Sequence, residues 1–172
     1  VAALVGLASI SEASSQLSFV EQEPVDNYGR RLTGEGSGWG GFQEETTDKF
    51  CLENRKGKGK FNKCDDHKKA QQWRFTEDYT KDEYLYGGQL KSRLDGGCLE
   101  VKGGKIRIGA KVRVNECDKD NDMQQWISDG DSVGPRHKKK FCLYHEGESV
   151  HKLDDVVLMK CEKTLSFNFG RK

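Results

Sequence analysis

The chain has 172 residues, with 29 Lys and Arg against 28 Asp and Glu, a formal net charge of +1. This length allows one domain, or one domain and a tail, and excludes an eight-stranded α/β barrel and a two-domain enzyme. The balanced charge excludes a disordered polyelectrolyte, although only 34% of the residues are hydrophobic. We therefore expect a folded domain with a small core.

Residues 1–13 are expected to be the C-terminal part of a signal peptide. Residues 1–10 are continuously apolar but too short to span a bilayer, and the small residues Ser11 and Ala13 fit cleavage after Ala13. The alternative is an apolar N-terminal strand or helix. Residues 14–37 show no periodicity and are expected to form a flexible, mostly acidic leader, so that the domain occupies residues 38–172.

Six cysteines compensate for the small core. An even number of cysteines in a chain expected to be secreted indicates disulfides, and six cysteines allow 15 pairings. The chain has no Cys-x-x-Cys, which argues against a zinc site, and no cysteine stands apart as a nucleophile. The cysteines follow one another as three pairs: Cys51 and Cys64, Cys98 and Cys117, and Cys142 and Cys161.

The sequence repeats with these pairs. The segment from Gly40 to Glu53 aligns without a gap on the segment from Gly87 to Glu100, and Gln71-Gln72-Trp73 recurs as Gln124-Gln125-Trp126. The third unit keeps Phe141-Cys142-Leu143 but has Leu165-Ser166-Phe167 in place of Gln-x-Trp. Three copies cannot close a propeller, and helical solenoids need 3.6-residue periodicity, which is absent.

The local patterns predict short strands. Residues 105–108 and 111–114 alternate polar and apolar around Gly109-Ala110, which predicts a hairpin. Residues 156–159 form a short apolar run that predicts another strand. Glycine pairs punctuate the chain at turn spacing, so we expect an all-β fold.

Three Cys-Leu units, each with a second internal cysteine, and two Gln-x-Trp motifs resemble the ricin-type β-trefoil lectin domain. This resemblance implies twelve strands in three four-strand lobes, a six-strand barrel capped by three hairpins, and one potential sugar pocket per lobe. The family's disulfides commonly close within a lobe, which implies Cys51–Cys64, Cys98–Cys117 and Cys142–Cys161. The first lobe departs from the family by a shorter cysteine interval, and the third by the missing Gln-x-Trp.

Aromatic residues at the motif are expected to build the core. Trp73 and Trp126 are interpreted as large apolar side chains that fill the pseudo-threefold core, with each indole N–H finding a partner. Phe167 is expected to fill the equivalent place without an N–H.

The resemblance also implies a sugar site made from a carboxylate, an aromatic platform and an Asn in each lobe. The corresponding positions hold Glu53, Glu100 and Tyr144; then Asn62, Asn115 and Met159; then Ala70, Met123 and Thr164. No lobe has the full set, and the second comes nearest. The candidate carbohydrate-binding residues are Glu53, Asn62, Gln71, Glu100, Asn115 and Gln124. The alternative for Glu53 and Glu100 is a solvated carboxylate on a half-exposed strand position.

Three acid-free basic stretches offer a second interpretation. They are residues 55–63, residues 102–113 and residues 136–140. On one face they would bind a sulfated or carboxylated polysaccharide, or nucleic acid. The alternative is solvated turns balanced by acids such as Asp65, Asp118 and Asp122.

No catalytic group is predicted. Gly130-Asp131-Ser132-Val133-Gly134 matches Gly-x-Ser-x-Gly but lacks a strand-turn-helix context, and no metal or cofactor site is indicated. We expect a secreted, non-catalytic module that binds glycans, with no membrane span and no nucleic-acid partner. The alternative is a degenerate trefoil that binds proteins or polyanions such as sulfated polysaccharide.

Overall fold

The computed structural model describes residues 39–44, 50–78, 86–129, 132–145, 149–161 and 167–169. The expected signal-peptide segment and leader lie outside these ranges. The strands are β1 (Phe42–Glu44), β2 (Phe50–Arg55), β3 (Lys58–Lys63), β4 (Trp73–Asp78), β5 (Tyr86–Ser92), β6 (Cys98–Val101), β7 (Val112–Asn115), β8 (Gln125–Ser128), β9 (Val133–Pro135), β10 (Phe141–His145), β11 (Val156–Lys160) and β12 (Phe167–Phe169). Two short 3-10 helices, η1 (Lys69–Gln71) and η2 (Asp122–Gln124), precede β4 and β8. The predicted all-β class is confirmed.

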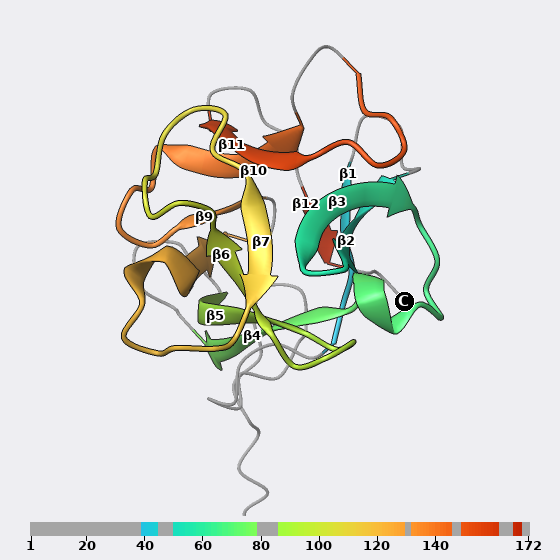
Figure 1. The fold of residues 1–172 in the computed structure, drawn as a ribbon, viewed down its shortest axis with the longest axis horizontal. Helices are drawn as coiled ribbons and strands as arrows, with labels where there is room; N and C mark the ends of the chain where they lie inside the picture. Colours follow the sequence, from blue (N-terminus) through green and yellow to red (C-terminus); the bar gives the residue numbers. More distant parts are fainter. Residues whose placement is uncertain are drawn as a thin grey trace, which may run out of the picture.

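The twelve strands divide into three lobes of four, β1–β4, β5–β8 and β9–β12, here called lobes 1, 2 and 3. Consecutive lobes join through antiparallel pairs of their outer strands, β4 with β5, β8 with β9, and β1 with β12. The inner strands of each lobe form a hairpin, β2–β3, β6–β7 and β10–β11 (Figure 1). Six barrel strands and three hairpins make the β-trefoil that the resemblance implied.

The register of the hairpins repeats from lobe to lobe. Cys51 faces Asn62, Cys98 faces Asn115, and Cys142 faces Met159. In each lobe the second cysteine lies two residues beyond this partner, where the first can reach it. The disulfides are Cys51–Cys64, Cys98–Cys117 and Cys142–Cys161, each within one lobe.

The hairpin predicted around Gly109-Ala110 is wrong in its first strand. β7 pairs with β6 instead, and residues 102–111 form the connection between them. Gly103, Gly104 and Gly109 have φ of +81°, +67° and +74°, which turn the chain out of an extended path. The alternation that resembled a strand arises because Ile106 joins the core while Ile108 is exposed. The strand predicted at residues 156–159 is confirmed as β11.

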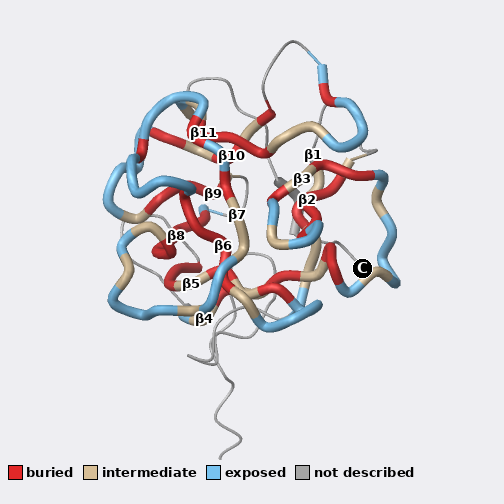
Figure 2. Tube along the Cα trace, in the orientation of Figure 1, coloured by how far each residue is buried: buried red, intermediate tan, exposed pale blue. Residues whose placement is uncertain are grey.

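The core lies where the barrel strands and hairpins meet (Figure 2). Trp73 and Trp126 are fully buried, and each indole Nε1–H donates to a backbone carbonyl oxygen, of Leu52 at 3.0 Å and of Leu99 at 2.8 Å. Phe167 opens β12, opposite Glu44. Among the described residues, no helix is long and apolar enough to cross a membrane.

Candidate functional site

Glu53 lies in β2 beneath the loop that follows β3. Only 3% of its surface is exposed, and its Oε2 accepts three hydrogen bonds. The donors are Asn62 Nδ2 at 2.8 Å, Lys68 Nζ at 2.7 Å and Gln71 Nε2 at 3.0 Å. Within the described part of the chain, no group donates to Oε1 of this carboxylate. One oxygen is therefore held by three protein donors, while the other has none among the described residues.

Glu100 occupies the equivalent place in β6 and is 4% exposed. Its Oε1 accepts from Nε of Arg113 at 2.8 Å and also from Nη2 of the same guanidinium. Its Oε2 accepts from Gln124 at 3.0 Å and from Asn115 and Asn121, each at 3.3 Å. Both oxygens are therefore occupied by protein groups in lobe 2.

One cross-strand neighbour explains this difference between the lobes. Lys60 faces Glu53 in the β2–β3 hairpin, as Arg113 faces Glu100 in the β6–β7 hairpin. Lys60 does not bond to Glu53, however, because its ammonium pairs with Asp155. The cation at this position therefore pairs with Asp155 in lobe 1, whereas in lobe 2 it pairs with the glutamate.

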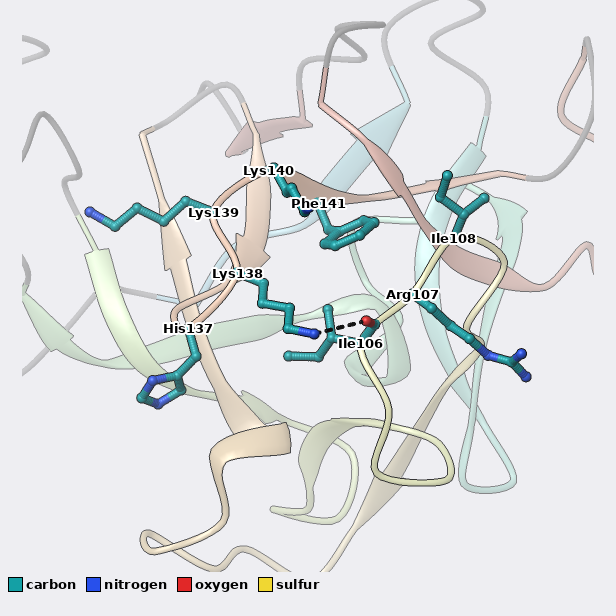
Figure 3. A pocket seen from close by; sticks show the side chains of 8 residues that line it. All are labelled: Ile106, Arg107, Ile108, His137, Lys138, Lys139, Lys140 and Phe141. Carbon is teal, nitrogen blue, oxygen red and sulfur yellow. Dashed lines mark hydrogen bonds between the residues drawn. The ribbon is translucent and has the colours of Figure 1, made fainter.

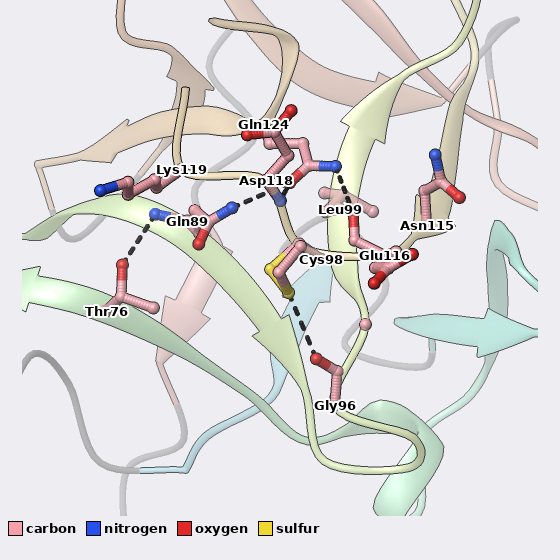
Figure 4. The surroundings of a disulfide bond; sticks show 12 residues. Thr76, Gln89, Gly96, Cys98, Leu99, Asn115, Glu116, Asp118, Lys119 and Gln124 are labelled. Atoms are coloured by element: carbon pink, nitrogen blue, oxygen red, sulfur yellow. Dashed lines mark hydrogen bonds between the residues drawn. A yellow bond between two sulfur atoms is a disulfide. The ribbon is translucent and has the colours of Figure 1, made fainter. Parts of the chain in front are cut away.

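Gln71 and Gln124 fasten the surface loop of each lobe to the buried carboxylate. Each is the last residue of a 3-10 helix, and each accepts a backbone N–H through Oε1, from Asp65 and Asp118, both at 2.9 Å. Each Nε2 donates to the glutamate and also to the backbone carbonyl oxygen just before the second cysteine, at 2.9 and 2.8 Å. Figure 4 shows Gln124 with Asp118 and Glu116, next to the Cys98–Cys117 disulfide.

The two glutamates have pKa values below their ordinary value. Burial alone raises the pKa of Glu53, but the surrounding hydrogen-bond donors and the charge of Lys68 outweigh it. Burial likewise raises the pKa of Glu100, and Gln124, Arg113 and Asn115 outweigh it. Both carboxylates are therefore ionised at neutral pH. The expectation that they are solvated on half-exposed positions is wrong, because the folded loops cover them and supply charge-assisted donors.

In each of these two lobes, residues that donate to the buried glutamate line a shallow pocket, although the glutamate itself is not among the lining residues. In lobe 1 it has a volume of about 390 Å³ and is lined by Asn62, Lys63, Cys64, Asp65 and Lys68. In lobe 2 it has a volume of about 520 Å³, and its lining includes Asn115, Asp118, Asn121 and Gln124. Both linings are polar and neither contains an aromatic side chain. A ligand in either pocket could form many hydrogen bonds but few apolar contacts.

Lobe 3 lacks this arrangement. Tyr144 stands at the carboxylate position and stacks on the ring of His145, with centroids 4.3 Å apart. Met159 stands at the platform position, and Thr164 lies outside the described residues. The described residues also contain no group of three His, Cys, Asp or Glu side chains that could hold a metal ion.

Sequence reasoning did not identify Lys68, Arg113 and Asn121 as partners of the two glutamates. Arg113 stood out only as part of a basic stretch, and its pairing with Glu100 was missed because the predicted hairpin set residues 111–114 against residues 105–108 instead of β6. Lys68 and Asn121 lie in loops, where no periodicity marks them. Their roles follow only from the folded loop.

Comparisons with known proteins show what the second and third lobes resemble. Residues 86–169, which run from β5 to β12, match the ricin-type beta-trefoil lectin domain. No curated protein gives a significant match to the chain. Lobe 1 lies outside the matched segment, yet it repeats the geometry of lobe 2.

Solved structures share the fold. The C-half of an earthworm R-type lectin in complex with GalNAc is 14% identical, with 76% of this chain and 96% of that chain covered and a TM-score of 0.57. The designed threefold-symmetric protein ThreeFoil is 19% identical, with 79% and 100% covered and a TM-score of 0.62. The β-trefoil lectin of the Vibrio vulnificus hemolysin/cytolysin, with N-acetyl-D-lactosamine bound, is 18% identical, with 78% and 96% covered and a TM-score of 0.50.

Proposed function

Since residues 86–169 belong to the ricin-type beta-trefoil lectin family, we propose that this chain is a non-catalytic carbohydrate-binding module. Its sugar sites are the polar pockets of lobes 1 and 2. The observation that carries this proposal is the recurrence of one arrangement, a buried ionised glutamate with Asn and Gln donors beneath a surface pocket, in two lobes. A pair of lobes would not keep the same buried charge for packing alone, since a buried charge is costly.

The chemistry of these pockets suits neutral sugars. Ionised carboxylates accept hydrogen bonds from vicinal hydroxyl groups, and amide groups both donate and accept. In lobe 1 the unbonded Oε1 of Glu53 is the natural acceptor for a sugar hydroxyl. In lobe 2 the Arg113 guanidinium occupies the equivalent oxygen. Lobe 1 is therefore the stronger site, although the sequence placed lobe 2 nearest to the family pattern.

Binding at one pocket should be weak. Neither pocket lining contains an aromatic ring on which the apolar face of a sugar could pack. In a shallow site that relies on hydrogen bonds, the ligand replaces water that bonded equally well, so the net gain in binding free energy is small. We expect a dissociation constant on the order of 1 mM per lobe, and stronger binding to surfaces that engage both lobes.

The decisive experiment is a neutral-glycan array followed by titration calorimetry with the best glycan. GalNAc, N-acetyllactosamine and 6'-sialyllactose are included because structural neighbours bind them. Glu53→Gln keeps the shape of the side chain but removes its charge, and should reduce binding about tenfold. Glu77→Gln, at an exposed carboxylate outside both pockets, is the matched control and should bind as the parent does. Equal binding by all three proteins would refute the assignment.

The proposal includes secretion. Three disulfides in a chain of 172 residues are typical of proteins that fold in an oxidising compartment. The apolar segment at residues 1–13 supports the same view. Immunodetection in the medium against the cell lysate tests it, and a protein found only in the cytosol with reduced cysteines would contradict it.

A further inference from the structure

A third cavity lies between lobes 2 and 3 and shares no residue with the two lobe pockets. Its volume is about 730 Å³, and it is lined by residues 106–108, from the β6–β7 connection, and residues 137–141, which lead into β10 (Figure 3). We call it the basic groove. The second and third basic stretches of the sequence meet here, one on each side.

The two sides of the basic groove are fixed in place. Ile106 and Phe141 are each 8% exposed and belong to the hydrophobic core. Lys138 reaches across to donate to the carbonyl oxygen of Ile106 at 3.4 Å, as Figure 3 shows. On the other side of Phe141, the Cys142–Cys161 disulfide and the bond from Cys161 N–H to the Lys140 carbonyl oxygen hold the loop. The groove therefore exists before any ligand binds.

Three cations of the groove have no acidic partner among the described residues. Arg107, Lys138 and Lys140 are exposed, and none forms an ion pair with a carboxylate among the residues that the structure describes. Asp122 pairs with His137 at the edge of the groove, at 3.1 Å. The whole chain carries a net charge of only +1, so these three cations give the groove a positive charge that the molecule as a whole almost lacks.

The first basic stretch, residues 55–63, does not line the basic groove. Lys60 of that stretch and Lys111 of the second both pair with Asp155, which lowers the pKa of this carboxyl despite its partial burial. These two cations are thus neutralised, whereas Arg107, Lys138 and Lys140 form no ion pair among the described residues. The alternative that acids balance the basic turns therefore applies to Lys60 and Lys111, through Asp155.

We propose that the basic groove binds a sulfated glycan. Sulfate groups carry a permanent negative charge that the three cations can match, and the exposed side chain of Ile108 with the edge of Phe141 offers apolar surface to a sugar ring. The volume lies in the range of pockets for small ligands, which corresponds to about one or two sugar residues. A nucleic acid fits less well, since base stacking needs an exposed aromatic face and Phe141 is nearly buried.

The experiment compares two charge-matched double variants for binding to a heparin-derived hexasaccharide. Lys138→Gln with Lys140→Gln removes two cations of the groove. Lys58→Gln with Lys69→Gln removes two exposed cations from lobe 1, so that the two double variants carry the same net charge. Affinity is measured at about 50 and 300 mM salt, and melting temperatures show that both variants are folded. A chemically desulfated hexasaccharide and a thymidine oligonucleotide of equal charge are the control ligands.

We expect the groove variant to weaken hexasaccharide binding on the order of tenfold at low salt, and the lobe 1 variant to weaken it less than about twofold. The desulfated sugar should bind neither protein measurably. Equal losses of affinity in the two variants would contradict the groove as the binding site. Tighter binding of the oligonucleotide than of the hexasaccharide would contradict a sulfated glycan as its ligand. Glu53→Gln should leave hexasaccharide binding unchanged, so this inference and the proposed lectin sites fail or succeed separately.

Discussion

The indole N–H of Trp126 donates to the carbonyl oxygen of Leu99 at 2.8 Å, across 27 residues of chain. Trp73 makes the same bond to Leu52 in lobe 1, at 3.0 Å. Each bond joins the tryptophan two residues after the end of a 3-10 helix to the residue that follows the first cysteine of its lobe. The Cys-Leu and Gln-x-Trp motifs are thus two halves of one contact, and this is why they recur together in the sequence.

Trp126→Ala should lower the free energy of unfolding by roughly 3–5 kcal/mol, because it opens a cavity in the core and leaves the Leu99 carbonyl without its donor. Chemical denaturation measures this loss. Trp39→Ala is the control, since Trp39 is 40% exposed and contacts Arg74 and Arg93 through its ring. It should cost no more than about 1 kcal/mol. Similar losses for both variants would contradict the core role of Trp126.

Replacing both Cys98 and Cys117 by Ala should cost about 3 kcal/mol, from the loop of 19 residues that the disulfide closes. The 13-residue loop of Cys51 and Cys64 should contribute slightly less. Peptide mapping under non-reducing conditions checks the pairing itself. A bridge between lobes, such as Cys64 with Cys98, would contradict the three-lobe arrangement.

Gly88→Ala should destabilise the junction of lobes 1 and 2. Gly88 has a φ of +84°, and an added Cβ would lie 2.5 Å from Oγ1 of Thr76, at the bulge in β4. Gly103→Ala is the matched control, with a φ of +81° and no atom within 4 Å of its Cβ position. The control should cost roughly 1–2 kcal/mol from backbone strain alone. A thermal melt that shows Gly88→Ala to be no worse than the control would remove the steric argument.

The fold could be predicted from the sequence because its determinants repeat at short range. The cysteine pairs, the Gly-Gly turns and the Gln-x-Trp motifs each recur in the printed sequence, and a β-trefoil is three copies of one unit. The alternation at residues 105–108 led to the wrong prediction of a strand. Ile106 points into the core from a loop that is shaped by glycines at positive φ and not by strand pairing. Periodicity cannot separate these two causes.

The environment of the candidate site could be predicted only in part. The positions of Glu53 and Glu100 follow from the repeat, but their surroundings depend on the loop residues Lys68 and Asn121, which lie 15 and 21 residues further along the chain. Lys60 and Arg113 are equivalent in sequence position, and both are basic. Only the placement of Asp155, in another lobe, decides that one of them leaves its glutamate.

Acid stability should depend on the two glutamates. Since their pKa values in the folded state lie below the ordinary value of 4.5, the folded protein holds its carboxylates ionised where the unfolded chain would protonate them. The resulting stabilisation is fully present above about pH 4.5 and is lost as the pH falls through the folded pKa values. Glu53→Gln with Glu100→Gln should therefore flatten the acid limb of stability against pH. Chemical denaturation of the parent and of the double variant across this range of pH measures the difference.

The last prediction concerns the guanidinium that separates lobe 2 from lobe 1. Arg113 occupies Oε1 of Glu100, while the equivalent oxygen of Glu53 accepts no hydrogen bond from the described residues. If sugar hydroxyls bind this oxygen, Arg113→Gln should release it and strengthen neutral-sugar binding in lobe 2. The Arg113 side chain is 43% exposed, so its removal opens no core cavity.

The measurement is made in a Glu53→Gln background, so that the measured sugar binding comes from lobe 2. Titration with the best neutral glycan should show a gain of about threefold to tenfold for Arg113→Gln, from about 1 kcal/mol of recovered hydrogen bonding. Lys60→Gln in the same background is the matched control, because the Lys60 ammonium pairs with Asp155 and lies in lobe 1, away from Glu100. It should leave the affinity unchanged. A loss of sugar binding with Arg113→Gln would mean that the guanidinium itself contacts the sugar, and that Glu100 serves to orient Arg113 rather than to bind.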